Sequence, residues 1–307
     1  MISKENANVS KITSTLIMAL GSIFCCALWG VSTPVVKMGY KYIDQNSIPS
    51  LMLWIGIQFL VAGVMTITFG CIKYKKIIIP KSKSSIKIIM IISLLQTILQ
   101  YIFSYIGLSY TTAVKGAVLK STDTLFVVLF ICIVFKKEKL TVRKTVACLL
   151  SFIGIIIINL KGFQFDMNIG DIMVVGSIVF YALGIVLTKI YASKENPITL
   201  CGYQMLVGGG VLVIVGFLFR GTMNYIGMLP FVISLSAIYA VAYALWTVLI
   251  KKYSVSKISI FSFTVPVFSV IFSRMFLKEQ DGISTIILII SLLFVSFGII
   301  LQSTSKT

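Results

Sequence analysis

Long apolar stretches alternate with short polar loops along the whole chain. Ten stretches stand out, at residues 15–38, 51–71, 86–108, 113–135, 145–160, 170–191, 198–219, 229–250, 258–277 and 283–302. A helix needs about 20 mostly apolar residues to cross the hydrocarbon core of a bilayer. The pattern therefore predicts an all-α integral membrane protein with ten transmembrane helices. Pro34 and Pro266 fall inside two of these stretches, where a proline kinks a helix or frees a carbonyl, so we expect hinges there.

The basic residues are distributed unevenly between the two sides that these helices define. Of the 27 Lys and Arg residues, 19 lie in the tails and loops of one side and 7 on the other, while Lys120 lies within the fourth stretch. Cytoplasmic loops carry the excess of Lys and Arg. We therefore expect residues 1–12 and 303–307 to be cytoplasmic tails of a protein in the cell membrane.

The composition agrees with this picture and excludes several chemistries. Hydrophobic residues make up 58% of the 307 and charged residues 12%, whereas soluble chains carry about 25% charged residues. The chain has no histidine, no Cys-x-x-Cys pair and no glycine-rich phosphate loop, so we expect no catalytic triad, metal, cofactor or ATP drive. The net charge of +18 sits in loops, which favours membrane topology over nucleic-acid binding. The isoleucine- and lysine-rich composition is compatible with an AT-rich bacterial genome.

Two short motifs recur in the second half of the chain. The run Gln58-Phe-Leu-Val-Ala-Gly-Val64 resembles Gln204-Met-Leu-Val-Gly-Gly-Gly210, and Phe135-Lys-Lys-Glu138 resembles Phe276-Leu-Lys-Glu279. The offsets are 146 and 141 residues, or five apolar stretches each time. Because five is odd, the second copy enters the membrane from the opposite side. The sequence thus predicts inverted repeats over 13–160 and 161–302, a design whose substrate sites lie near the midplane.

These motifs resemble those of a known family. Ala27-Leu-Trp-Gly30, Thr264-Val-Pro266 and the two Phe-x-Lys-Glu endings are similar to the EamA family of the drug/metabolite transporter superfamily, over about residues 15–302. The resemblance implies ten helices in two five-helix repeats around a central cavity. It also implies alternating-access transport of small organic metabolites, often export of amino acids or related compounds. One departure is Leu125, which stands where the second repeat has Pro266.

Polar and aromatic side chains recur on single faces of several apolar helices, at spacings of three, four or seven residues. The candidates for a water-filled cavity are Trp29, Thr33, Gln96, Gln100, Ser104, Tyr181, Tyr239, Tyr243, Trp246 and Ser262. The alternative is helix–helix packing, in which small and hydroxyl side chains permit close approach. A primary amide in hydrocarbon needs water or a partner, which favours the cavity for Gln96 and Gln100. We expect Gly208, Gly209 and Gly210 to serve packing.

Lys120 and Asp123 are the sharpest feature of the fourth apolar stretch. They are three residues apart, so they share a helix face, and the resembling proteins usually carry uncharged residues there. Charges inside a membrane are costly and by default mark a functional site. Three interpretations remain open: a substrate or coupling site, a structural ion pair, or a Lys120 side chain that reaches the interface. Glu138 and Glu279 border loops, where they fix local structure or latch a gate.

Together these features predict a secondary-active transporter of a small organic metabolite and not an enzyme. We expect an exporter of an amino acid or similar zwitterionic or carboxylate compound, driven by a proton, an ion or exchange. Lys120 would meet the carboxylate, and Asp123 or the glutamines would meet the amine. Aromatic rings also bind cations, so uptake of an organic cation or a sugar-like solute is the alternative. A membrane scaffold or a lipid-modifying enzyme is more remote, because a scaffold needs no polar faces and no catalytic constellation is visible.

Overall fold

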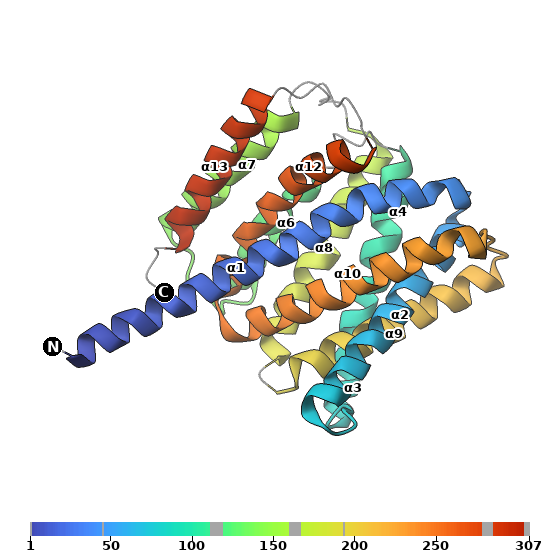
Figure 1. The fold of residues 1–307 in the computed structure, drawn as a ribbon, viewed down its shortest axis with the longest axis horizontal. Helices are drawn as coiled ribbons and strands as arrows, with labels where there is room; N and C mark the ends of the chain where they lie inside the picture. The colour runs from blue at the N-terminus through green and yellow to red at the C-terminus, as the bar shows by residue number, and fades with distance from the viewer. Residues whose placement is uncertain are drawn as a thin grey trace.

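The computed structural model describes residues 2–44, 46–110, 119–159, 167–192, 194–277 and 285–303. Every regular element in these ranges is a helix, apart from one isolated β-bridge between Ile43 and Met223 (Figure 1). The predicted all-α class is confirmed.

The longer helices follow the predicted apolar stretches closely. They are α1 (Ile2–Gly39), α2 (Ile48–Tyr74), α3 (Lys83–Ile92), α4 (Gln100–Tyr110), α6 (Asp123–Leu129), α7 (Val142–Asn159), α8 (Ile169–Tyr191), α9 (Pro197–Leu218), α10 (Tyr225–Lys252), α11 (Val255–Ser259), α12 (Val265–Leu277) and α13 (Thr285–Ser303). Two π-helical segments, η2 (Ser93–Leu99) and η3 (Phe130–Val134), extend α3 and α6, and two 3-10 segments, η1 (Tyr40–Tyr42) and η5 (Ile260–Thr264), follow α1 and α11. Seven helical stretches of the described chain are long and apolar enough to cross a membrane. The chain is therefore a multi-pass membrane protein.

Asparagine and serine side chains define where several of these helices begin. The Asn196 side chain accepts a hydrogen bond from the Ile198 backbone N–H at 2.9 Å, and Pro197 occupies the first turn of α9. Asn168 and Asp171 form a reciprocal capping box at the start of α8. Such caps satisfy N–H groups that no preceding turn can bind. The helix boundaries therefore follow from local sequence.

Helices α2 and α9 pack backbone to backbone. A Cβ atom placed on Gly63 of α2 would lie 2.6 Å from the Leu206 nitrogen, and one on Gly56 would lie 2.6 Å from the Val213 nitrogen. The contact position in α9 falls as the position in α2 rises, so the two helices are antiparallel. Gly209 faces the Gly56 carbonyl in the same contact, as the packing interpretation of this glycine predicts. Without a side chain, glycine allows dispersion contacts between backbones that hold membrane helices together.

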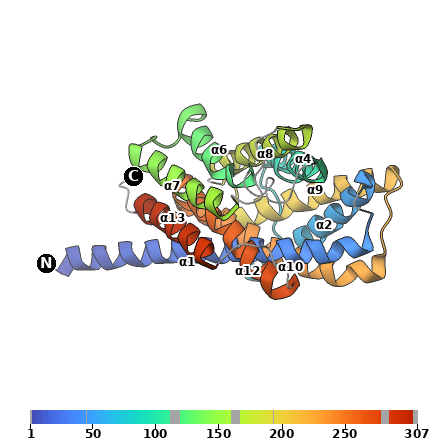
Figure 2. The same cartoon turned by 90° about the horizontal axis from the view of Figure 1, so that it is seen from above.

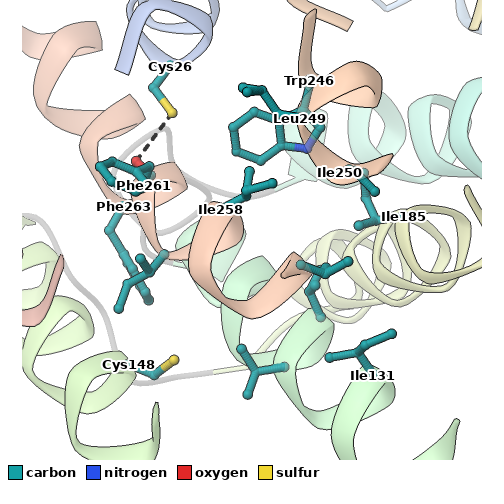
Figure 3. Packing of buried hydrophobic residues seen from close by; sticks show 14 of the residues in the cluster. Cys26, Ile131, Cys148, Ile185, Trp246, Leu249, Ile250, Ile258, Phe261 and Phe263 are labelled. Atoms are coloured by element: carbon teal, nitrogen blue, oxygen red, sulfur yellow. Dashed lines mark hydrogen bonds between the residues drawn. The ribbon is translucent and has the colours of Figure 1, made fainter. Parts of the chain in front are cut away.

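The remaining helices pack in further pairs to one side of this contact. Helix α1 lies against α10 and α12, α4 lies against α8, and α7 and α13 pair at one edge of the bundle (Figures 1 and 2). Apolar side chains fill the space where α10 ends and α11 begins. Figure 3 shows Trp246 and Ile250 of α10 beside Ile258 of α11, and all three are at most 1% exposed. This packing seals one end of the bundle.

The close approach of α2 and α9 makes a stability prediction. Gly209→Ala would place a Cβ 2.8 Å from the Gly56 carbonyl oxygen, so the two helices must separate. We expect overpacking to cost about 1–3 kcal/mol and to lower the apparent melting temperature of the purified protein. Gly210→Ala is the matched control, because its Cβ would meet only a Leu60 methyl group at 3.6 Å. Equal melting temperatures for the two variants would contradict the assignment.

Candidate functional site

A cavity of about 510 Å³ lies within the bundle. Its lining comprises Trp29, Ser32, Thr33, Val36, Lys37, Tyr40, Leu51, Gln100, Tyr101, Ser104, Tyr105, Lys120, Ser121, Asp123, Ser177, Ile178, Tyr181, Tyr239, Tyr243, Ser262, Val265, Pro266 and Ser269. Thr33, Lys37 and Lys120 are exposed, although all three lie on apolar helices. The cavity is therefore open to water and provides the solvation that charges inside a membrane helix require.

The cavity lies nearer the end of the bundle where α1 and α4 end and α8 and α10 begin, and its exposed residues Lys37 and Lys120 lie on that side. Its lining lies in the last third of α1 and in the first half of α8. The helix termini at this end are tied together by the bridge between Ile43 and Met223 and by a hydrogen bond from the Asn168 amide to the Tyr110 carbonyl. We call this the open end, and the opposite end, sealed by the packing around Trp246, the closed end.

Lys120 and Asp123 both face this cavity. Asp123 is half-buried and accepts a hydrogen bond from the Thr124 hydroxyl at 3.0 Å. Among the described residues, no ion pair within 4.0 Å joins the Lys120 ammonium to a carboxylate. The two opposite charges thus share one water-filled space without neutralising each other through direct contact.

Aromatic rings form the wall beside these charges. Trp29 of α1 packs edge-on against Tyr243 of α10, with ring centroids 5.4 Å apart. The Tyr243 hydroxyl shares a hydrogen bond of 2.9 Å with the Tyr101 hydroxyl, and Phe59 stacks on Tyr239 behind them at 5.1 Å. Edge-to-face and offset rings gain attraction beyond their buried area. The wall is therefore a rigid apolar surface that carries a few hydroxyl groups.

Two buried polar atoms at the cavity have no partner in the described protein: Trp29 Nε1 and Gln100 Oε1. One is a hydrogen-bond donor and the other an acceptor. An unpaired buried polar group costs about 1–3 kcal/mol. Because both atoms are buried from solvent, water or a solute can pair with them only after the lining side chains shift.

Ten of the twelve side chains predicted to bind substrate line the cavity; Gln96 and Trp246 lie elsewhere. Gln96 is 3% exposed, packs against Gly184 of α8 and accepts a hydrogen bond of 3.5 Å from the Thr188 hydroxyl. The sequence prediction assumed a regular helix, but Gln96 lies in π-helical η2, where a turn takes more residues. Trp246 is 1% exposed and sits behind Trp29, with ring centroids 4.9 Å apart.

The four predicted hinge or gate residues fall in three different places. Pro266 lines the cavity at the start of α12, directly after 3-10 segment η5. Pro34 is buried inside α1. Glu138 lies at the closed end, away from the cavity, and Glu279 is outside the described residues.

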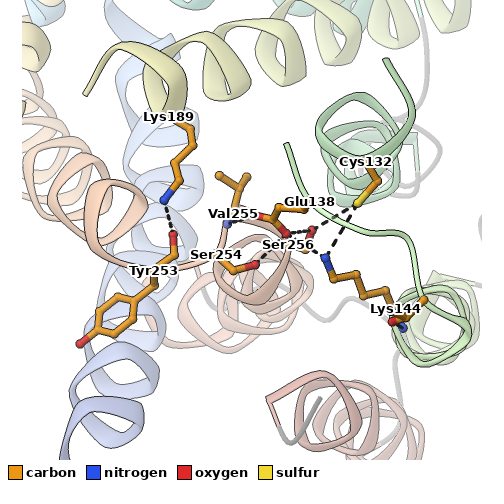
Figure 4. Close-up of polar contacts among 9 residues, drawn as sticks. Cys132, Glu138, Lys144, Lys189, Tyr253, Ser254, Val255 and Ser256 are labelled. Carbon is orange, nitrogen blue, oxygen red and sulfur yellow. Dashed lines mark hydrogen bonds and ion pairs between the residues drawn. The ribbon is translucent and has the colours of Figure 1, made fainter. Parts of the chain in front are cut away.

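Glu138 joins the loop after η3 to the start of α11 (Figure 4). Its carboxylate accepts hydrogen bonds from the Val255 backbone N–H at 2.7 Å, the Ser254 hydroxyl at 2.7 Å and the Ser256 hydroxyl at 2.6 Å. The Lys144 ammonium adds an ion pair of 2.9 Å. Burial alone would raise the pKa of Glu138, but the hydrogen bonds and the Lys144 charge outweigh it and hold the pKa below its usual value. We call this cluster of Glu138, Lys144, Ser254 and Ser256 the latch.

Further polar contacts hold the closed end. The Lys189 ammonium of α8 donates hydrogen bonds to the Ile250 carbonyl at 2.7 Å and to the Tyr253 carbonyl at 2.6 Å. Carbonyl groups at the C-terminal end of a helix such as α10 have no partner within the helix, and Lys189 supplies one. The Glu195 carboxylate accepts a hydrogen bond from the Lys81 backbone N–H at 3.0 Å. These contacts tie loops from both halves of the chain together.

Several lining residues were not among the predicted site residues, namely Ser32, Val36, Lys37, Tyr40, Leu51, Tyr101, Tyr105, Ser121, Ser177, Ile178, Val265 and Ser269. Spacing could have found part of this set, because Lys37, Ser177 and Ser269 continue the helix faces of Thr33, Tyr181 and Ser262. Tyr101 and Tyr105 follow Gln100 and Ser104 directly, so they required the actual rotation of α4. Among the described residues no group of three His, Cys, Asp or Glu side chains gathers to hold a metal.

Comparisons with known proteins identify a family model and several related transporters. The model of the EamA-like transporter family matches residues 13–160 and 168–302. An uncharacterized transporter of Bacillus subtilis, YvbV, is 28% identical over 293 residues, which cover 94% of this chain and 92% of that protein. An uncharacterized transporter of Archaeoglobus fulgidus is 25% identical and covers 84% of the chain and 89% of its own length.

A solved crystal structure shares the fold with a TM-score of 0.76 at 16% sequence identity, over 92% of this chain and 95% of the other. The fold, the water-filled cavity and the family match over both halves lead to one assignment: this chain is a transporter that belongs to the EamA-like transporter family.

Proposed function

We propose that this protein is a secondary-active transporter that binds a small zwitterionic or carboxylate metabolite, such as an amino acid, in the central cavity. The observation that carries the proposal is the placement of Lys120 and Asp123 in one wet cavity without an ion pair. A zwitterion presents both opposite charges at once. Its carboxylate would pair with Lys120 and its ammonium with Asp123, through charge-assisted hydrogen bonds.

The rest of the cavity complements such a solute. If the lining shifts to expose them, Trp29 Nε1 could donate to a carboxylate and Gln100 Oε1 could accept from an ammonium, so a zwitterion would pair with both atoms. Tyr181, Tyr239 and Tyr243 would enclose the organic body. The volume lies within the usual range for small-molecule sites, about 300–1,000 Å³. The aromatic wall beside Asp123 also favours a second candidate, an organic cation, which the Lys120 charge would repel.

The helix packing supports an architecture of ten helices in two inverted repeats, over 13–160 and 161–302. Glycines recur every seven residues at Gly56, Gly63 and Gly70 of α2 and at Gly202, Gly209 and Gly216 of α9, again with an offset of 146. Gln58 and Gln204 have this same offset. In this arrangement α1 of the first repeat corresponds to α8 of the second, and α4 corresponds to α10. The α1–α10 pair therefore corresponds to the α8–α4 pair, and both pairs are in contact.

Alternating access between the two ends of the cavity is the proposed mechanism. The basic loops place the closed end and both termini in the cytoplasm, so the open end faces outward across the cell membrane. Opening toward the cytoplasm would break the latch, because Glu138 follows the fourth apolar stretch and Ser254 precedes the ninth. Export is the direction that the family resemblance favours. A proton or ion gradient would supply the energy.

The charge pair offers the direct test of the substrate class. The purified protein would be screened by thermal shift against the twenty amino acids, and stabilising compounds would be tested for flux in proteoliposomes. We expect Lys120→Met with Asp123→Leu to fold but to lose at least about tenfold in flux, equal to about 1.4 kcal/mol of lost interaction. Lys83→Met, at an exposed position near the start of α3, is the control. Wild-type flux in the double variant would show that Lys120 and Asp123 have a structural role and do not bind the substrate.

The latch makes a stability prediction with a defined pH dependence. Glu138→Ala leaves the Lys144 ammonium, whose side chain is 7% exposed, buried without its carboxylate. Breaking such a pair costs about 3–5 kcal/mol. Because the pKa of Glu138 is held below its usual value, its contribution persists above that usual value and disappears as the pH falls through the lowered pKa.

The difference in apparent melting temperature between wild type and Glu138→Ala should therefore be constant near neutral pH and narrow in acid. The neighbouring exposed residue provides the control, Lys139→Ala, which should melt like wild type. A gap that widens in acid would refute the role of the ionised carboxylate.

The proposed orientation is tested by labelling from outside the cell. In a cysteine-free background, an impermeant maleimide should label Asn46→Cys, in the loop between α1 and α2, and should leave Lys76→Cys unlabelled until the cells are opened. Both positions are exposed, and the loop with Lys76 carries the densest basic charge. Labelling of Lys76→Cys in intact cells would show that the protein has the opposite orientation in the membrane.

A further inference from the structure

Thr124 connects the cavity charge to the backbone of another helix. Its hydroxyl lies 3.0 Å from Asp123 Oδ1 and 2.8 Å from the carbonyl oxygen of Ser259, and the residue is 0% exposed. A threonine hydroxyl has one proton to donate. The two acceptors therefore compete for that proton as long as Asp123 is ionised.

Ser259 lies at a change of helix type within its membrane span. It is the last residue of α11, after which the chain continues as 3-10 segment η5 and then as α12. Hydrogen bonds in a 3-10 segment have poorer geometry than those of an α-helix. Pro266, at the second position of α12, has no N–H to stabilise the turn before it. The hydrogen bond from Thr124 thus supports a carbonyl at a break between two helical segments.

Protonation of Asp123 would end the competition. A protonated carboxyl group can donate its own O–H to Thr124 Oγ1, which leaves the threonine proton entirely for the Ser259 carbonyl. Every donor and acceptor is then paired. With Asp123 ionised, the carboxylate draws the same proton away from Ser259. The charge state of Asp123 therefore changes the hydrogen bond that the Ser259 carbonyl accepts, at the junction between α11 and α12.

Among the described residues, Lys120 and Lys37 are the charged groups that line the cavity together with Asp123. Lys120 lies one turn away on the same face, while Cys26 of α1 and Tyr181 of α8 face the carboxylate with neutral side chains. From α11 and η5, which also pack against α6, the Ser259 carbonyl reaches Thr124. Occupation of Asp123 by a proton or an ammonium group is therefore the main change in charge that this site can make.

We propose that Asp123 is the proton-coupling site of this transporter and that Thr124 is the positioning residue that transmits its charge state to α11 and α12. The inference rests on the proposed function, because the ammonium of the substrate would use the same carboxylate. A carboxylate that takes a proton releases an ammonium group, and the two cannot be held together. The result is antiport of substrate against protons.

The stoichiometry follows from this exclusion. On the outer side, one proton from water binds the Asp123 carboxylate and the substrate ammonium leaves outward. On the inner side, that proton dissociates to cytoplasmic water and a new substrate ammonium replaces it. One proton enters for each substrate exported, and no other reactant is needed.

The first measurement follows the carboxyl group without any substrate. Infrared difference spectra of the protein in lipid would record the protonated C=O stretch over about pH 4–9, with Asp123→Asn identifying the band. We expect one band that titrates in this range and is absent from the variant. A spectrum without such a band would overturn the proposal, whatever flux the protein shows.

The second measurement follows the conformation through the native tryptophans. Trp54 and Trp246 are at most 1% exposed, whereas Trp29 lines the cavity, so iodide added only outside right-side-out vesicles should quench mainly Trp29 and only while the outer end is open. We expect the quenching constant to fall by about half along the carboxyl titration, as closed and open states become equally populated. Asp123→Asn should show no such pH dependence.

The role of Thr124 is tested by comparing the infrared titration with the tryptophan quenching in Thr124 variants. In Thr124→Val the carboxyl band should still titrate while the quenching no longer follows it, and Thr124→Ser should restore the link. Thr66→Val is the matched control, since this buried threonine donates only to the Ala62 carbonyl of its own helix. If Thr124→Val does not fold, Thr124→Ala replaces it. Quenching that follows the titration in the variant without the hydroxyl would refute the transmission role.

Flux distinguishes this inference from the substrate assignment. If the band titrates and the quenching follows it, but none of the amino acid probes binds or moves, the coupling site stands and the substrate class is wrong. If a probe moves at a rate that a pH gradient does not alter, the substrate class stands and the coupling site is wrong.

Discussion

Polar groups inside a bilayer must find a partner or water, and the arrangement of this protein depends on that constraint. Lys120 and Asp123 can stay apart only because the helices around them leave a water-filled cavity. The surrounding helices in turn avoid unpaired backbone by remaining helical up to capped ends, as Asn168 and Asn196 show. Where the α-helix gives way to 3-10 segment η5, a side chain from a neighbouring helix adds a hydrogen bond to the backbone.

The two ends of the cavity differ in the kind of contact that holds them. At the open end, the described contacts include the bridge between Ile43 and Met223 and the hydrogen bond from Asn168 to the Tyr110 carbonyl, and the lining residues Thr33, Lys37 and Lys120 are exposed. At the closed end, the latch combines a buried carboxylate with three hydrogen bonds and an ion pair beside the apolar packing around Trp246. Such a cluster is stable when complete and costly when half broken. A gate of this kind favours two discrete states over gradual opening.

The sequence predicted the membrane fold and the family because both depend on features that repeat or are contiguous. Apolar stretches, basic loops and motifs such as Ala27-Leu-Trp-Gly30 are readable without knowing any contact. Ten of the twelve predicted binding residues line the cavity for the same reason, because helical spacing is readable from the sequence, whereas twelve other lining residues were not predicted. The placement of Gln96 could not be predicted in this way, because a π-helical turn directs its side chain toward α8 and no residue type predicts such a turn. The bond from Thr124 to Ser259 joins residues 135 apart and required the tertiary structure.

The glycine contact between α2 and α9 has a consequence for the membrane in which the protein works. Association of these helices rests on dispersion between backbones, not on removing apolar surface from water. Its strength should therefore depend little on the length or saturation of the surrounding acyl chains. We expect this pair to keep the same geometry in thin and thick bilayers, while helices that meet through side chains adjust their tilt. A microbe that remodels its lipids with temperature would thus keep the α2–α9 contact of its transporter unchanged.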